Sequence, residues 1–251
     1  MATASLIGRR FGPTVSGWLV GIPFTSGPIA LFLFLDHGAT FATSAALGSS
    51  LGVVPTLAWA IAYSAVAARG AGLIAAMAAG LAVFTLIAAA VHDLSIGPLA
   101  LYALIATLLV IAIRIIRPPA VIYTVRPPWW DLPARMVIAT ILVLAITGGS
   151  EVIGPRLSGL LATIPLYASI LAAFAQRQAG AAAAVQVWRG LFFGLFGFGA
   201  FYLVLATGLE TIGLAAFGLA LAASLLLQLL TLGLLSRIRG TAARSEDGSR
   251  T

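Results

Sequence analysis

The chain has 251 residues, of which 61% are hydrophobic and only 8% are charged, and its mean hydropathy is +1.10. Soluble domains are about 45–50% apolar and about 25% charged, so this composition excludes a water-soluble globular protein as well as a disordered chain. The net charge of +7 does not indicate nucleic-acid binding, because all fourteen basic residues are arginines spread along the chain. The lack of cysteine excludes disulfides and thiolate metal sites. The sequence therefore predicts a polytopic membrane protein whose first partner is the lipid bilayer.

Eight apolar stretches are long enough to be transmembrane helices. A helix needs about 20 apolar residues to cross a hydrocarbon core of about 30 Å, and Gly, Pro and charged residues separate the stretches. Alternation with a period of two is missing, which favours helices over barrel strands. We predict an all-α integral membrane protein with these eight spans: 14–35, 42–68, 71–92, 95–116, 133–150, 156–176, 181–208 and 211–236.

The arginines sort to one side of the membrane when the N-terminus is placed in the cytoplasm. Twelve of the fourteen then lie on the inner side, whereas Arg156 lies outside and Arg189 falls within a span. Because inner loops carry an excess of Arg and Lys, we predict that both termini are cytoplasmic. The acidic residues then mark the outer ends of the spans, at Asp36, Asp93, Glu151 and Glu210.

Pro-rich and polar stretches divide the chain into four parts. Residues 117–132 contain two Pro-Pro pairs and a Trp-Trp pair, which predicts a stiff cytoplasmic linker with its rings at the headgroup level. Residues 240–251 are polar and are predicted to form a disordered cytoplasmic tail. Residues 1–116 then hold spans 1–4, and residues 133–239 hold spans 5–8.

A string of matching residues recurs at an offset of 142 residues. Its members are Gly12-Pro13, Ser16-Gly17, Leu19, Ile22-Pro23, Gly38, Gly48 and Gly52, and their matches are Gly154-Pro155, Ser158-Gly159, Leu161, Ile164-Pro165, Gly180, Gly190 and Gly194. The two copies start in span 1 and span 6, an odd number of helices apart, so they cross the membrane in opposite directions. The sequence therefore predicts an inverted internal repeat of spans 1–3 and 6–8. Secondary transporters are often built this way, although some channels share the plan.

Each copy of the repeat has a proline near the middle of its first span. Pro23 and Pro165 lie about ten residues, or about 15 Å, into their spans and thus near the bilayer midplane. Such a proline frees a backbone carbonyl, and transporters place substrate sites at broken helices. A kink that only shapes the helix for packing is the alternative interpretation. The predicted substrate-binding residues are Pro23, Thr25, Ser26, Thr163, Pro165, Tyr167 and Arg189.

Arg189 is the charged residue that the span assignment places inside a helix. A charge at this depth costs at least about 2.5–3.5 kcal/mol, so it needs a partner or contact with water. We expect it to be an electrostatic anchor for an anionic group of a solute. The alternative is a long side chain that reaches back to the inner headgroups.

Other polar and glycine motifs have simpler interpretations. Asp36-His37 and His92-Asp93 lie at outer ends and could form a cation or proton entry site, but their spacing matches no metal motif. Gln228 in span 8 is expected to form an interhelical hydrogen bond. Three pairs of glycines four residues apart predict close helix packing within the chain, with a homodimer contact as the alternative: Gly17 and Gly21, Gly48 and Gly52, and Gly190 and Gly194.

Glycine and proline positions in the second half also suggest a relationship. They are Ser158-Gly159-Leu160, Ile164-Pro165-Leu166, Gly180, Gly190 and Gly194. With these residues, spans 5–8 resemble one unit of the small four-helix bacterial inner-membrane proteins of the GlpM type, and the first half looks like a second copy that lacks its leading helix. The resemblance implies a bacterial inner-membrane protein. That family has no established reaction or substrate to carry over.

These observations predict a small secondary transporter of a bacterial inner membrane, with a mid-membrane site between the broken first and sixth spans. The alternative is a non-transporting membrane subunit or scaffold, in which the prolines only shape helices. A polar, water-filled centre would favour the transporter, and a packed dry centre with glycine faces turned to lipid would favour the subunit. Motifs for catalysis, cofactors or metals are missing from the sequence, so we do not expect an enzyme.

Overall fold

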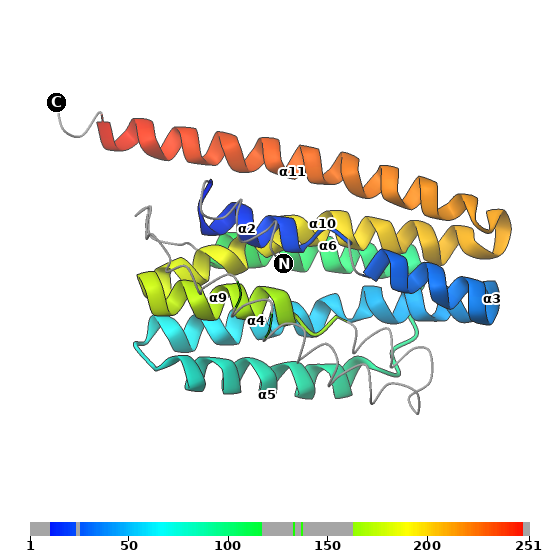
Figure 1. The fold of residues 1–251 in the computed structure, drawn as a ribbon, viewed down its shortest axis with the longest axis horizontal. Coiled ribbons are helices and arrows are strands. Elements are labelled where there is room, and N and C mark those ends of the chain that lie inside the picture. The colour runs from blue at the N-terminus through cyan, green and yellow to red at the C-terminus, as the bar shows by residue number, and fades with distance from the viewer. Residues whose placement is uncertain (1–10, 24–25, 117–132, 134–136, 138–162, 248–251) are drawn as a thin grey trace.

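A computed structural model describes residues 11–23, 26–116, 133, 137 and 163–247, with side chains as far as residue 236. All regular structure in these residues is helical (Figure 1). Five segments are long and apolar enough to cross a membrane, which makes this a multi-pass membrane protein. The helices are α2 (Pro13–Val20), α3 (Ser26–Leu51), α4 (Val53–Ala68), α5 (Leu73–Val91), α6 (Pro98–Ile115), α9 (Leu166–Ala179), α10 (Ala181–Ile212) and α11 (Ala215–Asp247).

Four of the predicted spans are confirmed as single helices. The predictions at 71–92, 95–116, 181–208 and 211–236 match α5, α6, α10 and the apolar part of α11. The prediction at 42–68 falls within a 43-residue helical stretch, Ser26–Ala68, that the structure places across α3 and α4.

The remaining predictions differ from the structure or lie outside the described residues. The stretch 14–35 is two helical pieces, because α2 ends at Val20 and α3 begins at Ser26. Span 133–150, most of the linker 117–132 and the first part of span 156–176 lie outside the described residues. The tail predicted to be disordered from residue 240 continues α11 as far as Asp247, since Ala and Arg there are good helix formers.

Two long helical segments form the centre of the protein, and the shorter helices cover it. The apolar windows of Ser26–Ala68 and Ala181–Ile212 are 61% and 67% buried, whereas those of α5, α6 and α11 are 17%, 22% and 28% buried. The outer helices expose large apolar side chains such as Ile74, Leu99 and Leu230. Such apolar outer faces are suited to contact with lipid tails.

A single glycine reverses the chain between a short and a long helix in each half. Gly38 inside α3 has φ 82° and ψ 178°, and Gly180 between α9 and α10 has φ 83° and ψ 178°. Side chains with a Cβ rarely adopt this backbone conformation. These two residues are 142 positions apart, so the offset found in the sequence also relates two equal backbone turns.

Helices that the 142-residue offset would match, α4 with α10 and α5 with α11, run in opposite directions (Figure 1). From the turn at Gly38 the chain returns through α4 to the left end of the view, and α5 leads back to the right. In the second half, α9 runs to the left end, α10 runs to the right, and α11 returns to the left. The α4–α5 and α10–α11 connections therefore lie at opposite ends of the protein.

The charged residues at the helix ends separate in the same way. The C-terminal ends of α4, α6 and α9 lie at the left end in Figure 1, and they carry Arg69, Arg114 and Arg177. The opposite end holds the α5–α6 and α10–α11 connections, with Asp93 and Glu210 beside them. The described residues thus have an arginine-bearing end and an acidic end.

Cysteine labelling can test this separation directly, because the chain contains no cysteine. His37→Cys and His92→Cys are expected to react with a membrane-impermeant maleimide from one side of the membrane. Arg69→Cys and Arg177→Cys are expected to react from the other side. Labelling of positions 37 and 177 from the same side would contradict the arrangement of helices described above.

The two glycine turns give a second test. Gly38→Ala and Gly180→Ala place a Cβ in a backbone conformation that costs on the order of 1–3 kcal/mol, so both variants are expected to unfold at lower temperature. Gly72→Ala is the matched control, because Gly72 has φ −63° and its added Cβ would meet no atom within 4 Å. Thermal unfolding in detergent measures all three, and equal stability of the Gly38 and Gly72 variants would contradict the expectation.

Candidate functional site at two crossed helix breaks

The first helix break lies between α2 and α3. Gly21 ends α2, and Pro23 is buried in the gap before Ser26. The carbonyl of Pro23 accepts a hydrogen bond from the amide of Gly27 at 3.0 Å, which starts the next helix. Ser26 is half-buried, whereas the predicted site residue Thr25 lies outside the described residues. The break predicted from Pro23 is therefore present.

The second break precedes α9. Pro165 is buried and stands at the N-terminus of this helix, and its carbonyl accepts a hydrogen bond from the amide of Ser169 at 2.8 Å. Thr163 and Tyr167 flank the proline and are half-buried. Helix α9 thus begins at the position that the repeat matches to the first break.

Each break packs against the long helix of the other half. A Cβ on Gly21 would overlap the backbone of Gly194 in α10, and a Cβ on Gly52 would overlap the side chain of Thr163. Gly21 and Thr163 are 142 positions apart, and so are Gly52 and Gly194. Applying the 142-residue offset to one contact therefore gives the other contact, with the roles of the two halves exchanged. Each break thus meets the long helix of the other half at the same relative position.

Hydroxyl groups donate to backbone carbonyls at both breaks. Thr56 Oγ1 lies 2.8 Å from the carbonyl oxygen of Thr163 and 2.9 Å from that of Gly52 in its own helix. Tyr202 in α10 donates to the carbonyl of Ser26 at 3.3 Å. In both cases a hydroxyl on one half reaches a carbonyl at the break of the other half. In an apolar environment a carbonyl without a partner is costly, so the Thr56 donor stabilises the break at Thr163, which precedes α9. Ser26 begins α3, so its carbonyl also accepts within that helix.

A glycine seam joins α2 to α10. A Cβ on Gly17 would overlap the carbonyl of Val187, and one on Gly190 would overlap the carbonyl of Thr14. These glycines therefore face another helix of the same chain, as predicted for close packing within the chain. Such small-residue contacts let helix backbones approach closely in lipid.

Arg189 lies on a different face of α10 from the breaks. Val187 and Leu191 contact α2 at Gly17, and Arg189 is two residues from each of them, which places it on the far side of the helix. The side chain is half-buried and follows the fully buried Trp188. The structure thus places Pro23, Ser26, Thr163 and Pro165 at the two breaks, whereas Arg189 lies on the face of α10 away from its contact with α2.

Among the described residues, the histidine and carboxylate groups at the acidic end are not gathered into a metal-binding cluster. His92 Nε2 lies 2.9 Å from Asp93 Oδ2, with both side chains exposed, and the ring of His37 packs on Phe41 with centroids 4.5 Å apart. In the described part of the chain, three or more His, Asp or Glu side chains do not gather where they could hold a metal ion. Glu151 lies outside those residues.

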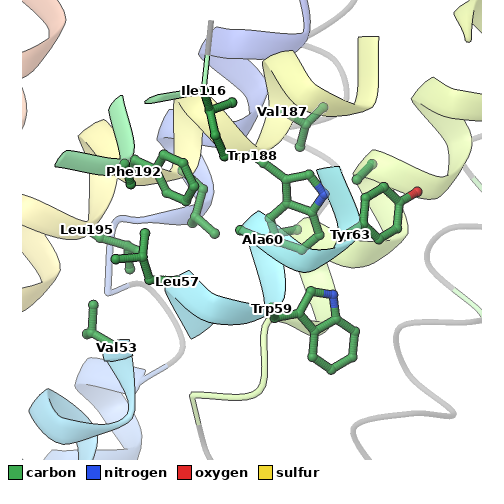
Figure 2. Close-up of a cluster of buried hydrophobic side chains, with 14 of the residues drawn as sticks. Val53, Leu57, Trp59, Ala60, Tyr63, Ile116, Val187, Trp188, Phe192 and Leu195 are labelled. Carbon is green, nitrogen blue, oxygen red and sulfur yellow. The ribbon is translucent and has the colours of Figure 1, made fainter. Parts of the chain in front are cut away.

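A contact between the halves that sequence reasoning missed lies toward the arginine-bearing end. Tyr63 of α4 donates to Gln176 Oε1 of α9 at 2.6 Å, and its ring lies 5.4 Å from that of Trp188 in α10. Tyr63 and Trp188 are fully buried in the apolar cluster shown in Figure 2. A tyrosine and a glutamine within apolar helices were the available signal, but their pairing depends on how the helices are rotated.

A second buried polar contact fixes α11. Gln228 Nε2 donates to the carbonyl of Gly194 in α10 at 2.9 Å, and Trp18 Nε1 donates to Thr231 Oγ1 at 3.1 Å. The interhelical hydrogen bond predicted for Gln228 is therefore confirmed. The hydrogen bond is accepted by Gly194, the same residue that contacts Gly21 at the first break. Helices α11 and α2 therefore both contact α10 at Gly194.

No family model, curated protein or solved structure matches this chain. The resemblance to the GlpM type therefore stays a prediction from glycine and proline positions.

The glycine seam gives a prediction about packing. Gly17→Ala would force α2 and α10 apart, and overpacking of this kind costs about 1–3 kcal/mol. We expect a lower unfolding temperature in detergent and loss of the Trp18–Thr231 contact, measured as a change in tryptophan fluorescence. Gly218→Ala on α11 is the control, since its Cβ would meet no atom within 4 Å. A stable Gly17→Ala protein with unchanged fluorescence would contradict the proposed closeness of the seam.

Proposed function

We propose that this protein is a small secondary transporter built from two inverted copies of one unit, with eight spans and both termini in the cytoplasm of a bacterial inner membrane. The observation that carries the proposal is the exchanged contact between the two breaks and the two long helices, Gly21 with Gly194 and Thr163 with Gly52. Two similar halves of opposite direction can exchange conformations, and this exchange opens a central site first to one side and then to the other.

The difference between the two ends fits one state of such an exchange. Toward the arginine-bearing end, Tyr63 and Gln176 join the halves by a hydrogen bond. The positions equivalent to them, Leu205 and Phe34, belong to an apolar cluster toward the other end. At the arginine-bearing end a hydrogen bond therefore joins the halves, whereas the equivalent residues belong to an apolar cluster. We call the Tyr63–Gln176 hydrogen bond the latch. We infer that the Tyr63–Gln176 contact holds the arginine-bearing end closed.

Distances between spin labels test the exchange without knowledge of the solute. One pair joins the halves at the arginine-bearing end, Arg69→Cys with Arg177→Cys, and a second pair lies at the acidic end, Asp36→Cys with Glu210→Cys. Tyr63→Phe removes only the latch hydroxyl, whose hydrogen bond contributes about 1 kcal/mol, on the order of a five-fold change in population. We expect the first distance to lengthen and the second to shorten in part of the molecules.

The matched control is Thr85→Val, because the Thr85 hydroxyl donates to Leu81 of its own helix at 2.9 Å and joins no halves. This variant is expected to leave both distance distributions unchanged. Opposite changes at the two ends in the Tyr63→Phe protein support the transporter. If each label pair shows one distance, and Tyr63→Phe changes neither of these distances, alternating access is ruled out.

A non-transporting membrane subunit is the second candidate. The observation that favours it is the dense apolar filling between the long helices, where Trp188, Phe192 and Leu57 are buried together (Figure 2). However, Gly17, Gly190 and Gly194 face helices of the same chain and are not left for a partner protein. The spin-label distances separate the two candidates, since a rigid subunit has one distance at each end.

A further inference from the structure

A pocket of about 390 Å³ lies between the second part of α3 and the start of α6. Ser44, Leu47 and Leu51 line it from α3, and Ser95 and Leu101 line it from the other side. Leu51 and Leu101 are buried, whereas Ser95 is an exposed residue of the α5–α6 connection. The pocket therefore has a buried apolar floor and a mouth at this connection.

The lining of the pocket is suited to the apolar part of an organic molecule. The volume falls within the range of about 300–1,000 Å³ that is usual for small-molecule sites. The lining side chains are apolar except for the hydroxyls of Ser44 and Ser95. Apolar walls bury an apolar body favourably, but they cannot replace the hydration of a bare ion. Any charged group of a ligand is therefore expected at the mouth.

A carboxylate stands beside this mouth. Asp93 directly precedes the lining residues Leu94 and Ser95, and its side chain is 88% exposed. One of its oxygens, Oδ2, lies 2.9 Å from His92 Nε2. A carboxylate has two acceptor oxygens, so Asp93 can accept from a ligand as well as from His92. The ligand group that suits Asp93 is a donor, and a cationic donor forms the stronger hydrogen bond.

The other charges near the mouth do not reverse this preference. The N-terminus of α6 carries a partial positive charge, but the C-terminus of α5 across the connection carries a partial negative one. Pro98, the first residue of α6, also has no amide hydrogen to donate. Asp36 and Glu210 lie toward the same end of the protein, and Arg69, Arg114 and Arg177 lie at the opposite end. The described charges therefore attract cations to the end that holds the mouth.

We propose that this pocket binds a hydrophobic amine, with its apolar body between α3 and α6 and its ammonium group at the mouth against Asp93. The hydroxyl oxygen of Ser95 at the mouth can accept from the same ammonium group, which has three donors. Helices α3, α5 and α6 all belong to the first half of the chain. The site needs no exchange between the halves, so this inference goes beyond the proposed function.

Protection of a cysteine in the pocket tests the proposed site. Leu47→Cys, the only cysteine of that variant, is labelled with N-ethylmaleimide in phosphatidylcholine vesicles at pH 7, where alkylamines are protonated. Hexylammonium, hexanol and hexanoate are added separately, because they share one apolar chain and differ in the charge of the head group. We expect hexylammonium to slow the labelling. Leu86→Cys, on the exposed face of α5, is expected to show no protection.

Asp93→Asn in the Leu47→Cys background removes the charge at the mouth and keeps the shape of the side chain. We expect half protection by hexylammonium to need on the order of two- to five-fold more ligand, because an exposed charge pair contributes up to about this factor. Half protection by hexanol is expected to stay the same, which also shows that the variant is folded. Comparing each ligand with itself in the two proteins cancels its partitioning into lipid.

Asp36→Asn is the matched control for the carboxylate. It removes an exposed charge at the same end of the protein, but Asp36 adjoins no residue that lines the pocket. We expect it to change half protection by hexylammonium less than Asp93→Asn does. Equal effects of the two variants would contradict the placement of the ammonium group at Asp93.

Two further results would overturn the proposal. The first is a Leu47→Cys protein that hexylammonium does not protect. The second is an equal response of hexylammonium and hexanol to Asp93→Asn, because the pocket would then take any apolar chain. Neither result depends on the distances between spin labels, so the site and the proposed transporter are tested separately.

Discussion

Close approach of helix backbones at glycines is the constraint on which the rest of this structure depends. Helix α2 has only eight residues, and an isolated helix of that length is not stable. It is held because Gly17 and Gly21 let its backbone touch α10. Between helices in lipid the driving force is van der Waals packing, which acts only at short range. A side chain at either glycine would therefore separate the broken helix from the long helix that supports it.

Each half of the chain supplies a hydroxyl donor at the helix break of the other half. A break leaves backbone carbonyls without their helical partners, and lipid offers none. Thr56 of the first half reaches the carbonyl of Thr163, and Tyr202 of the second half reaches the carbonyl of Ser26. These two hydroxyl contacts tie each break to the other half of the chain.

The prolines predicted the breaks at Pro23 and Pro165, because proline acts on the local backbone, and the arginines predicted the direction of the spans. The turns at Gly38 and Gly180 were not predicted, although the offset of 142 residues relates the two glycines. The face of α10 that carries Arg189 and the partner of Tyr63 could not be predicted, because sequence gives the depth of a residue in a span but not the face that it presents. Arg189 lies only five residues from Gly194, yet on another side of α10. Tyr63 meets Gln176, which is 113 positions away and on a helix of the other half.

The two halves share a backbone plan but differ in what fills it, and this difference bears on function. If the repeat served only to build a stable bundle, equivalent places would be expected to be equally well packed, since unfilled apolar space loses contacts. Instead, Phe193 lies in a small cluster with Trp18 and Leu235, whereas Leu51, its match at the 142-residue offset, lies in the large central cluster. The hydrogen bond of Tyr63 likewise has only apolar residues as its counterpart. The proposed exchange between two states would therefore start from halves that match in their glycine turns but differ in one polar contact.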